Sequence, residues 1–470
     1  MKHYDIIVIG SGGGSKISTP SSKLGYKVAL VEKGPLGGTC LNRGCIPSKM
    51  LIHAADVAHV IQEANRFEIF PKGYDIDFPA LVHRVCNTID AESSSINPAI
   101  EANPNIDWYR HHGKFTGDKQ LEAGGETITG DKIFITAGAR PRIPNIPGLQ
   151  DVPFITSTEA LRLDQFPKKM VVLGGGYIAA ELSHYFQALG TEIHMFVRSR
   201  MLKGEDFEVR DEFEKVFGQR HHLYFGIQPN KIQHTNGEFE VTYSDQEGKS
   251  HCINCDQVFV ATGVVPNSDQ LDLEKTGVEI NEKGFIKVDD HLRTTADNIW
   301  AFGDIAGNYL FRHSANFEGQ YLFASVIHEA TKSPIDYTGM PHAVFTQPQI
   351  AGVGELEQDL MARGANYVKG INLYASSAMG MALRSDHGFV KILIEKKTHK
   401  ILGCHIIGHE ASVLIHQIIP LMRLEGKLED LLYMIHIHPA LSEIVRNAAR
   451  KARDELIKDG EELPIELQIA

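Results

Sequence analysis

Two glycine-rich turns, each placed directly after a continuous apolar run, constrain the fold of this chain more than any other feature. The first follows Ile6–Ile9 and reads Gly10-Ser11-Gly12-Gly13-Gly14-Ser15, and the second follows Met170–Leu173 and reads Gly174-Gly175-Gly176-Tyr177-Ile178-Ala179. A short apolar run of this kind is typical of a parallel strand buried on both faces. Glycine permits a tight turn in which a pyrophosphate approaches the N-terminus of a helix. The sequence therefore predicts an α/β fold with two Rossmann-like dinucleotide-binding domains.

The first unit departs from the dinucleotide pattern at two positions. Ser15 stands where a third glycine is expected, and Pro20 is expected to end or kink the helix that follows the turn. The next predicted strand, Lys27–Val31, is followed by Glu32, where a carboxylate can bind ribose hydroxyls. Alone, this turn is a weak indication of a nucleotide site, and the second copy strengthens it.

The second unit ends in a basic segment. We expect a helix over Leu182–Leu189 and a strand over Glu192–Val197, and three basic residues follow: Arg198, Arg200 and Lys203. No carboxylate stands at the strand end to bind a free ribose 2′-hydroxyl, whereas guanidinium groups bind phosphate in a bidentate manner. The segment therefore favours NADPH over NADH, and a solvent-exposed basic loop is the alternative interpretation.

A further similarity between the two units lies downstream of each turn. The segment Ile133-Phe134-Ile135-Thr136-Ala137-Gly138 resembles Val258-Phe259-Val260-Ala261-Thr262-Gly263, and each is an apolar strand that ends in small residues. Small residues there allow the backbone to approach a nucleotide closely. Two such units imply two bound dinucleotides, of which one accepts hydride and the other delivers it.

A pair of cysteines follows the first unit, in the segment Gly37-Gly38-Thr39-Cys40-Leu41-Asn42-Arg43-Gly44-Cys45-Ile46-Pro47-Ser48-Lys49. A dithiol near a redox cofactor suggests that electrons pass through a disulfide. On a regular helix, Cα atoms five residues apart are about 8.6 Å from each other, and a disulfide tolerates at most about 7 Å. A bridge therefore needs a distorted turn, which Gly44 could permit. Two unpaired or buried cysteines are the alternative.

Composition and charge narrow the possible functions. A chain of 470 residues is too long for one core, so we expect about two to four domains. No apolar run is long enough to cross a membrane, and Met1–Tyr4 leads directly into a strand, which favours the cytoplasm over secretion. The net charge of −12 argues against nucleic acid as a partner. Cys252 and Cys255 have no second pair nearby, so we expect no metal site there.

The order of these motifs along the chain resembles that of the class I flavoprotein disulfide reductases, which include dihydrolipoamide dehydrogenase, glutathione reductase, mycothione reductase and mercuric reductase. Beside the two turns and the cysteine pair, the resemblance rests on Gly303-Asp304 and on His438-Pro439 with Glu443. It covers nearly the whole chain. The resemblance implies an FAD domain over 1–149, an NAD(P) domain over 150–270, a central segment over 271–340 that completes the FAD domain, and a C-terminal α+β dimerisation domain over 341–470.

The resemblance also implies roles for residues around the dithiol. Cys45 is similar to the flavin-proximal thiol, and Cys40 is similar to the thiol that exchanges with substrate. Lys49 and Glu181 resemble the ion pair beside the flavin. By the same resemblance the FAD-binding residues are Gly10, Gly12, Gly14, Glu32, Lys33, Thr39, Lys49, Lys114, Ala137, Gly138 and Asp304. The corresponding NAD(P)-binding residues are Gly174, Gly176, Tyr177, Ala179, Glu181, Arg198, Arg200, Lys203 and Gly263.

The C-terminal histidine implies a partner subunit. His438 and Glu443 match the family's HPxxSE pattern, with Ala440 in place of the frequent threonine. An imidazolium beside a thiol favours the reactive thiolate, and Glu443 could orient the ring. In the family this histidine serves the active site of the other subunit, so the resemblance implies a homodimer. For His436, packing and a supporting role are equally open.

Segments around the site point to two substrates. The stretch Lys16–Pro20 lacks the arginine that binds glutathione in glutathione reductases, which disfavours glutathione as the substrate. No cysteine pair follows Cys404, which disfavours mercuric and thioredoxin reductase activity. Leu310–Ala315 resembles dihydrolipoamide dehydrogenase, whereas Tyr177 resembles the aromatic gate over the nicotinamide pocket of NADPH-dependent reductases. We therefore expect a mycothione-reductase-like, FAD-dependent enzyme that reduces a small thiol disulfide with NADPH. Dihydrolipoamide dehydrogenase, acting on a dithiol with NAD, is the alternative, and an NAD(P)H oxidase or transhydrogenase would not need the dithiol.

Overall fold

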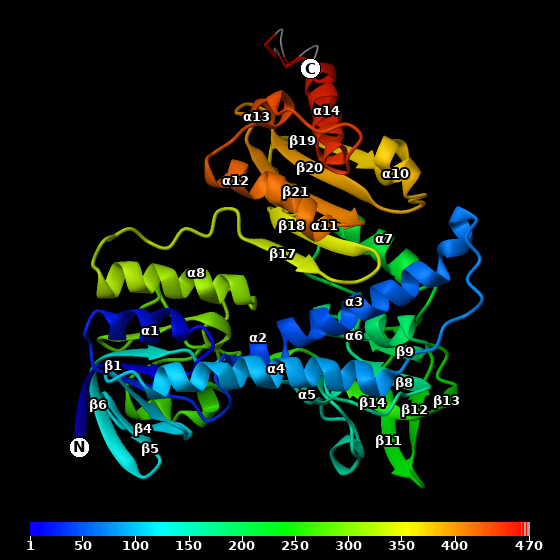
Figure 1. Ribbon diagram of the computed structural model, residues 1–470. Helices are drawn as coiled ribbons and strands as arrows, with labels where there is room; N and C mark the ends of the chain where they lie inside the picture. The colour runs from blue at the N-terminus through cyan, green and yellow to red at the C-terminus, as the bar shows by residue number, and fades with distance from the viewer. Residues whose placement is uncertain (462, 465–466, 468–470) are drawn as a thin grey trace.

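A computed structural model describes residues 1–461, 463, 464 and 467 of the protein. It confirms the predicted α/β class: two largely parallel sheets lie side by side, and a C-terminal unit packs above them (Figure 1). Residues 462, 465–466 and 468–470, the last of the predicted dimerisation domain, lie outside the described residues.

The first sheet is built around the N-terminal strand. Its order is β3-β2-β1-β6-β5-β4, with β16 paired to β6, and β1 is parallel to both β2 and β6. Ile6–Ile9 are buried, as the apolar run predicts. The strands are β1 (Lys2–Ile9), β2 (Val28–Val31), β3 (Ile106–Tyr109), β4 (Gly113–Gly117), β5 (Gln120–Ala123), β6 (Glu126–Ile135) and β16 (Ile299–Ala301). The helices of this unit are α1 (Ser15–Lys23), α2 (Gly38–Arg43), α3 (Cys45–Gln62), α4 (Phe78–Glu101) and α8 (Arg312–Leu322).

Pro20 is expected to end or kink the first helix, and the helix does not end there but runs on to Lys23. Proline removes one backbone hydrogen bond inside a helix and is expected to destabilise it. Here the helix is held by tertiary packing: it lies beside α8 (Figure 1), and Ile17 belongs to a buried cluster with Leu30 and Leu322. The packing of one face outweighs the lost hydrogen bond.

The second sheet repeats the parallel arrangement. Its order is β10-β9-β8-β14, all parallel, and β9 has the bounds predicted from the sequence. Its strands are β8 (Lys169–Leu173), β9 (Glu192–Val197), β10 (His222–Phe225) and β14 (Gln257–Val260), with helices α5 (Ser157–Ala160), α6 (Tyr177–Ala188) and α7 (Phe207–Phe217). An antiparallel meander of β11 (Pro229–Thr235), β12 (Glu238–Ser244) and β13 (Ser250–Cys255) and a short pair, β7 (Ala139–Pro141) with β15 (Val264–Pro266), complete the unit.

The C-terminal unit is a separate antiparallel sheet. Its order is β17-β18-β21-β20-β19, and the long helix α14 packs against β19 and β20. Its strands are β17 (Pro341–Val344), β18 (Gln349–Gly354), β19 (Tyr367–Leu373), β20 (Phe389–Glu395) and β21 (Ile401–Gly408). Its helices are α9 (Glu357–Ala362), α10 (Ala378–Ala382), α11 (Ala411–Leu414), α12 (Ile418–Arg423), α13 (Leu428–Tyr433) and α14 (Ser442–Lys458). Among the helices of the described residues, none has the length and apolar character that crossing a membrane requires.

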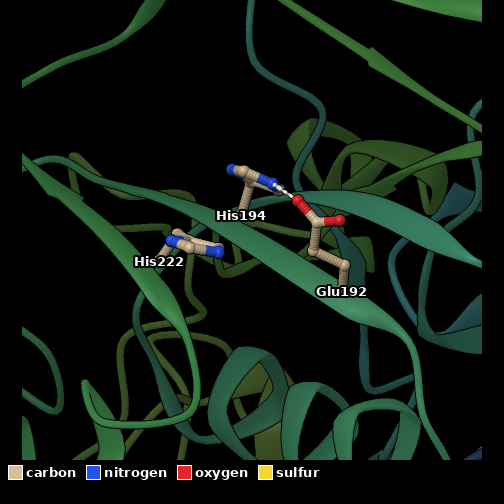
Figure 2. Close-up of side chains that lie close together, drawn as sticks. All are labelled: Glu192, His194 and His222. Carbon is tan, nitrogen blue, oxygen red and sulfur yellow. Dashed lines mark hydrogen bonds and ion pairs between the residues drawn. The ribbon is translucent and has the colours of Figure 1, made fainter.

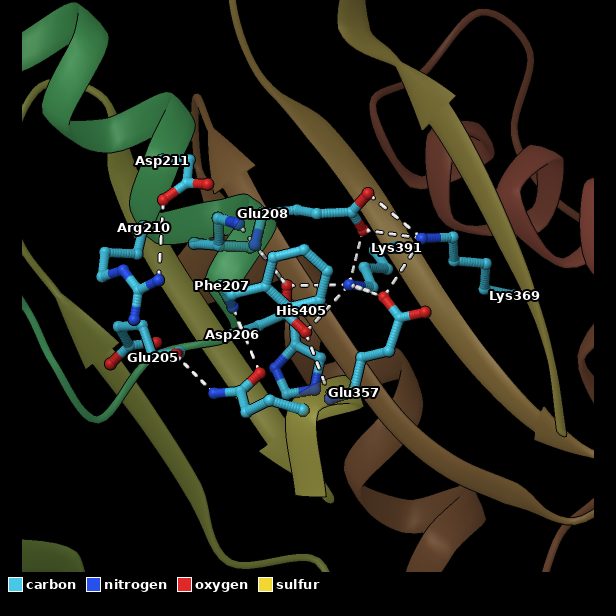
Figure 3. Close-up of polar contacts among 12 residues, drawn as sticks. Glu205, Asp206, Phe207, Glu208, Arg210, Asp211, Glu357, Lys369, Lys391 and His405 are labelled. Carbon is cyan, nitrogen blue, oxygen red and sulfur yellow. Dashed lines mark hydrogen bonds and ion pairs between the residues drawn. The ribbon is translucent and has the colours of Figure 1, made fainter. Parts of the chain in front are cut away.

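A buried lysine joins the C-terminal sheet to the second unit. The side chain of Lys391, on β20, is 0% exposed, and its Nζ lies 2.9 Å from both carboxylate oxygens of Asp206 and 2.6 Å from Glu208 (Figure 3). It also pairs with Glu357. Asp206 in turn caps α7, because its carboxylate accepts the backbone N–H of Glu208. A buried charge without partners is strongly destabilising, so these contacts fix the loop between β9 and α7 against the C-terminal sheet.

Candidate active site

The two glycine turns are built in the same way. The backbone N–H of Thr136 donates to the carbonyl of Ile9, and the N–H of Ala261 donates to that of Leu173. In each unit one backbone carbonyl of the small-residue segment lies against the first glycine of the turn. A Cβ atom on Gly10 would be 2.4 Å from the Thr136 oxygen, and one on Gly174 would be 2.2 Å from the Ala261 oxygen. Both glycines also have positive φ, +102° and +131°, which other residues rarely adopt. The two downstream segments therefore lie in the same position against their glycine turns.

One cavity of about 2020 Å³ connects the two turns and the cysteine pair. Most of the residues predicted from the sequence line it: Gly10, Gly12, Glu32, Lys33, Thr39, Cys40, Cys45, Lys49, Ala137, Gly138, Gly174, Gly176, Tyr177, Glu181, Arg198, Arg200, Lys203, Gly263 and Asp304. Of the predicted cofactor-binding residues, three do not line it: Gly14 packs against the Gly10 carbonyl, Ala179 is buried, and the Lys114 side chain lies 3.9 Å from Asp272.

The lining of the cavity fits a flavin dinucleotide. Asp304 has no hydrogen-bond partner among the described residues, and burial together with the Glu318 carboxylate raises its pKa to about 6. A hydroxyl donor would satisfy this carboxylate. At the opposite edge Glu32 follows β2, and its Oε2 accepts the N–H of Ser11 at 2.9 Å, which places a carboxylate beside the first turn. A ligand with hydroxyl groups and a pyrophosphate matches these donors and acceptors.

Gly44 interrupts the helix between the two cysteines. Helix α2 ends at Arg43 and α3 begins at Cys45, while Gly44 has φ −145° and ψ −117°, outside the helical range. A Cβ atom there would lie 3.0 Å from the carbonyl oxygen of Thr39. This break brings the Cys40 and Cys45 thiols into hydrogen-bond contact, which a continuous helix would not allow.

The two thiols differ in acidity. The hydrogen bond from Cys45, followed by the positive charges of Arg312 and Lys49, lowers the pKa of Cys40 to about 7. The same hydrogen bond and burial raise the pKa of Cys45 above its ordinary value. Thiolate is the reactive form, so Cys40 is the better nucleophile at neutral pH. This supports the expectation that Cys40 exchanges with substrate.

Residues from all three units meet beside the dithiol. Lys49 Nζ, on α3, lies 2.6 Å from Glu181 Oε2, on α6. The other oxygen of Glu181 accepts the backbone N–H of Phe345 at 3.0 Å, and the ammonium of Lys49 lies 4.4 Å from the centre of the Phe345 ring. The Lys49–Glu181 pair is therefore held by contacts from all three units, and it lines the cavity beside the dithiol.

The basic residues after β9 are not equivalent. The Arg200 guanidinium binds Glu214 at 2.7 Å and Asp211 at 2.5 Å. Arg198 and Lys203 line the cavity and form no ion pair or side-chain hydrogen bond within the described part of the chain. These two cations are therefore better placed than Arg200 to bind an added phosphate.

His438 is held in position but lies away from the dithiol of its own chain. Its Nδ1 is 3.0 Å from Glu443 Oε2, and the other Glu443 oxygen accepts from Arg446 at 2.7 Å. The side chain is 72% exposed and does not line the cavity. The neighbouring His436 contacts the Met434 carbonyl at 2.9 Å, so its ring is bound within its own loop. His438 therefore does not contribute to the cavity of its own chain.

Two further clusters do not have the geometry of metal sites. Glu192, His194 and His222 gather on β9 and β10 (Figure 2). The two imidazoles are stacked at 4.5 Å and 17°, so their in-plane lone pairs run parallel and do not converge on one ion. Lys169 also lies 3.1 Å from Glu192. Cys252 is exposed and Cys255 is buried, on opposite faces of β13, so they cannot share an ion.

Four residues of the site were missed in the sequence. Arg312, the first residue of α8, lowers the pKa of Cys40. Phe311 stacks on the ring of Tyr177. Glu205 accepts a hydrogen bond from the Tyr177 hydroxyl and is paired with His342. Arg312 and Phe311 fall inside Leu310–Ala315, the segment that resembles dihydrolipoamide dehydrogenase. Glu205 and His342 follow no motif, because they act only through a contact between two units.

The chain matches two family models in succession. Residues 4–320 match the pyridine nucleotide-disulphide oxidoreductases, and residues 340–449 match the dimerisation domain of that family. Mycothione reductase of Mycobacterium tuberculosis is 35% identical over 461 residues, which cover 95% of this chain and 99% of the relative. Dihydrolipoyl dehydrogenase of Halobacterium salinarum is 33% identical over 463 residues, which cover 95% and 96%. RclA, an HOCl-induced flavoprotein disulfide reductase from Escherichia coli, is 26% identical, with a TM-score of 0.85 over 95% of this chain and 99% of that one.

The acidity of Cys40 can be tested by alkylation. We expect iodoacetamide to react with Cys40 of the reduced protein at a rate that reaches half its maximum near pH 7, because the pKa is about 7. In Cys45→Ala the midpoint should rise towards about 8.5, since the thiolate loses its main donor. Cys45→Ser keeps a hydroxyl donor and should change less. Peptide mass spectrometry across pH measures these rates, and an unchanged midpoint in Cys45→Ala would contradict the assignment.

Proposed function

Because the chain belongs to the pyridine nucleotide-disulphide oxidoreductase family, whose members act on sulfur groups, we propose that it uses NADPH and FAD to reduce the disulfide of a small thiol, as a reductase of the mycothione reductase type. The observation that carries this proposal is the shared cavity. It is lined by both glycine turns and by the Cys40–Cys45 pair, so two dinucleotides and a dithiol can exchange electrons over short distances. Both family matches support the enzyme class, and the substrate is the part that we propose.

The first turn and Asp304 would hold FAD, which supplies a centre that accepts hydride from the pyridine nucleotide and passes two electrons to the Cys40–Cys45 disulfide. The chain contributes the surroundings of that step. Lys49 and Glu181 lie as an ion pair next to the dithiol and place a fixed positive charge there. The Phe345 ring lies against the ammonium group and adds a cation–π contact.

The thiols carry the exchange with substrate. Cys40 as thiolate attacks one sulfur of the substrate disulfide, which forms a mixed disulfide and releases one thiolate. Cys45 then attacks the Cys40 sulfur, which restores the internal disulfide and releases the second thiol. His438 of the partner subunit protonates the leaving thiolate, and Glu443 orients that ring through the hydrogen bond to Nδ1.

NADPH is the proposed nucleotide because of the two available cations. Arg198 follows the last residue of β9, where the ribose of a nucleotide on the second turn would lie, and Lys203 lies on the same side of the cavity. Guanidinium and ammonium groups both bind phosphate. No carboxylate from this strand end competes for the 2′ position.

Dihydrolipoamide dehydrogenase is the second candidate. The specific observation in its favour is the segment Leu310–Ala315, which lines the cavity at Phe311 to His313, together with the 33% identical dihydrolipoyl dehydrogenase. In that function every step above runs in reverse. The direction depends on small differences in potential, since about 30 mV corresponds to 1.4 kcal/mol.

A homodimer completes the proposed site. Residues 340–449 match a dimerisation domain. The loop that carries His438 also leaves Ile435 and Ile437 almost entirely exposed. Apolar side chains this exposed are typical of a surface that another chain covers.

Steady-state kinetics distinguish the two functions. We expect kcat/KM to be higher with NADPH and a small-thiol disulfide such as mycothione than with NAD and dihydrolipoamide. The Cys40→Ser variant should lose disulfide turnover while NADPH still bleaches the flavin, because reduction of the flavin by NADPH does not require the Cys40 thiol. Higher efficiency with dihydrolipoamide and NAD would establish the alternative.

Nucleotide preference tests the role of Arg198. In Arg198→Met we expect kcat/KM for NADPH to fall roughly tenfold or more, since a charged hydrogen bond is lost, and the value for NADH to stay unchanged. Arg200→Met is the matched control, because that guanidinium is already engaged by Glu214 and Asp211. An equal loss in both variants would contradict the assignment of the phosphate site to Arg198.

Subunit mixing tests the shared site. Neither Cys45→Ser nor His438→Ala should be active alone, but heterodimers formed from the two contain one intact site and should recover part of the wild-type activity. Native mass spectrometry confirms that heterodimers have formed. Absence of recovery in verified heterodimers would place His438 outside the active site.

A further inference from the structure

Tyr177 lies between the second glycine turn and the first unit. It is the first residue of α6, directly after Gly176, and it lines the cavity. Its ring stacks on Phe311 of the first unit, with ring centres 5.9 Å apart and planes at 27°. A nicotinamide that starts from the second turn must therefore pass this ring to reach the flavin side of the cavity.

The hydroxyl of Tyr177 is bound by a buried carboxylate. It donates to Glu205 Oε1, and Glu205 Oε2 lies 2.8 Å from His342 Nε2. The Glu205 side chain is only 1% exposed. Burial alone would raise its pKa, but His342 and the Tyr177 hydroxyl hold the pKa of Glu205 below its ordinary value, so the acceptor is charged. Tyr177 and His342 therefore both donate to an ionised carboxylate.

The C-terminal unit holds Glu205 at its carboxylate and at its backbone. His342 lies on β17, and the backbone carbonyl of Glu205 accepts the side-chain N–H of Gln358, on α9, at 2.9 Å. The next residue, Asp206, is bound by the buried Lys391 (Figure 3). Room for the His342 ring depends on Gly352, because a Cβ atom there would lie 2.6 Å from that imidazole. Glu205 therefore has little freedom to follow Tyr177 if the ring moves.

We propose that Glu205 is a positioning residue that latches Tyr177 across the cavity, so that entry of the nicotinamide ring requires the Tyr177–Glu205 hydrogen bond to open. The proposal rests on the proposed function, because it takes a pyridine nucleotide as the ligand of the second turn. It extends that function by assigning control of nucleotide access to a contact between the nucleotide unit and the C-terminal sheet. His342 holds the carboxylate in place from β17, and Phe311 provides the surface against which the ring rests.

The latch predicts that weakening the Tyr177–Glu205 hydrogen bond makes NADPH bind more tightly. Opening a hydrogen bond to a charged group costs free energy that binding must supply, so in Tyr177→Phe and in Glu205→Gln we expect the Kd of NADPH to fall by about three- to tenfold. The double variant should gain no more than the single variants, because all three lack the same charged bond. Anaerobic stopped-flow measurement of flavin reduction against NADPH concentration gives the Kd of the holoenzyme.

Two controls separate the latch from a general disturbance. Tyr224→Phe removes a hydroxyl that contacts His194 and lies outside the cavity, so the Kd of NADPH should stay within about twofold of wild type. The alkylation rate of Cys40 should be the same in every variant, because the dithiol does not depend on the latch.

The outcomes are distinct. Lower Kd values in both single variants that do not add in the double variant establish the latch. Unchanged or higher Kd values, or effects that add, overturn it while leaving the proposed function intact. If neither NADPH nor NADH bleaches the flavin of the wild-type protein, the proposed function fails and the latch fails with it.

Discussion

The contact between a glycine turn and a neighbouring carbonyl is the constraint on which the rest of this structure depends. In both units the small-residue segment after a parallel strand places a carbonyl oxygen within 2.2–2.4 Å of where the Cβ of Gly10 or Gly174 would be. No other residue fits, and the backbone there stays open to a ligand. The same contact occurs in both units, and both turns line one continuous cavity together with the Cys40–Cys45 pair.

The dithiol depends on a second backbone feature of the same kind. A regular helix would separate Cys40 from Cys45, and the break at Gly44 brings their thiols together. This contact gives the two thiols different acidities, because the hydrogen bond that Cys45 donates favours Cys40 as the thiolate. The positive charges of Lys49, in the same segment, and of Arg312, on α8, act in the same direction. The C-terminal sheet contributes through Phe345 and Lys391, so the chemistry of the site is supported by all three units.

Much of the fold and of the site could be predicted because those features are local. The strand ending at Ile9, the strand over Glu192–Val197 and the two turns each follow from a few consecutive residues with one backbone requirement. Local patterns were not sufficient where packing at a distance decides. The helix through Pro20 is held by burial against α8, and Arg200, which lies in the predicted phosphate-binding segment, is engaged by α7. Glu205 has no motif, since its partners lie on α6 and β17.

The sequence by itself determined that the chain folds as two dinucleotide-type units with a dithiol between them, and that a C-terminal histidine stands beside a glutamate. These are properties of residue type and short spacing. Only the tertiary structure decided which thiol is acidic, which cations remain available to a phosphate, and that Tyr177 is tied to the C-terminal sheet through Glu205 and His342. Each of these depends on burial and on the distance between segments far apart in the chain, which set electrostatic energies that no local pattern contains.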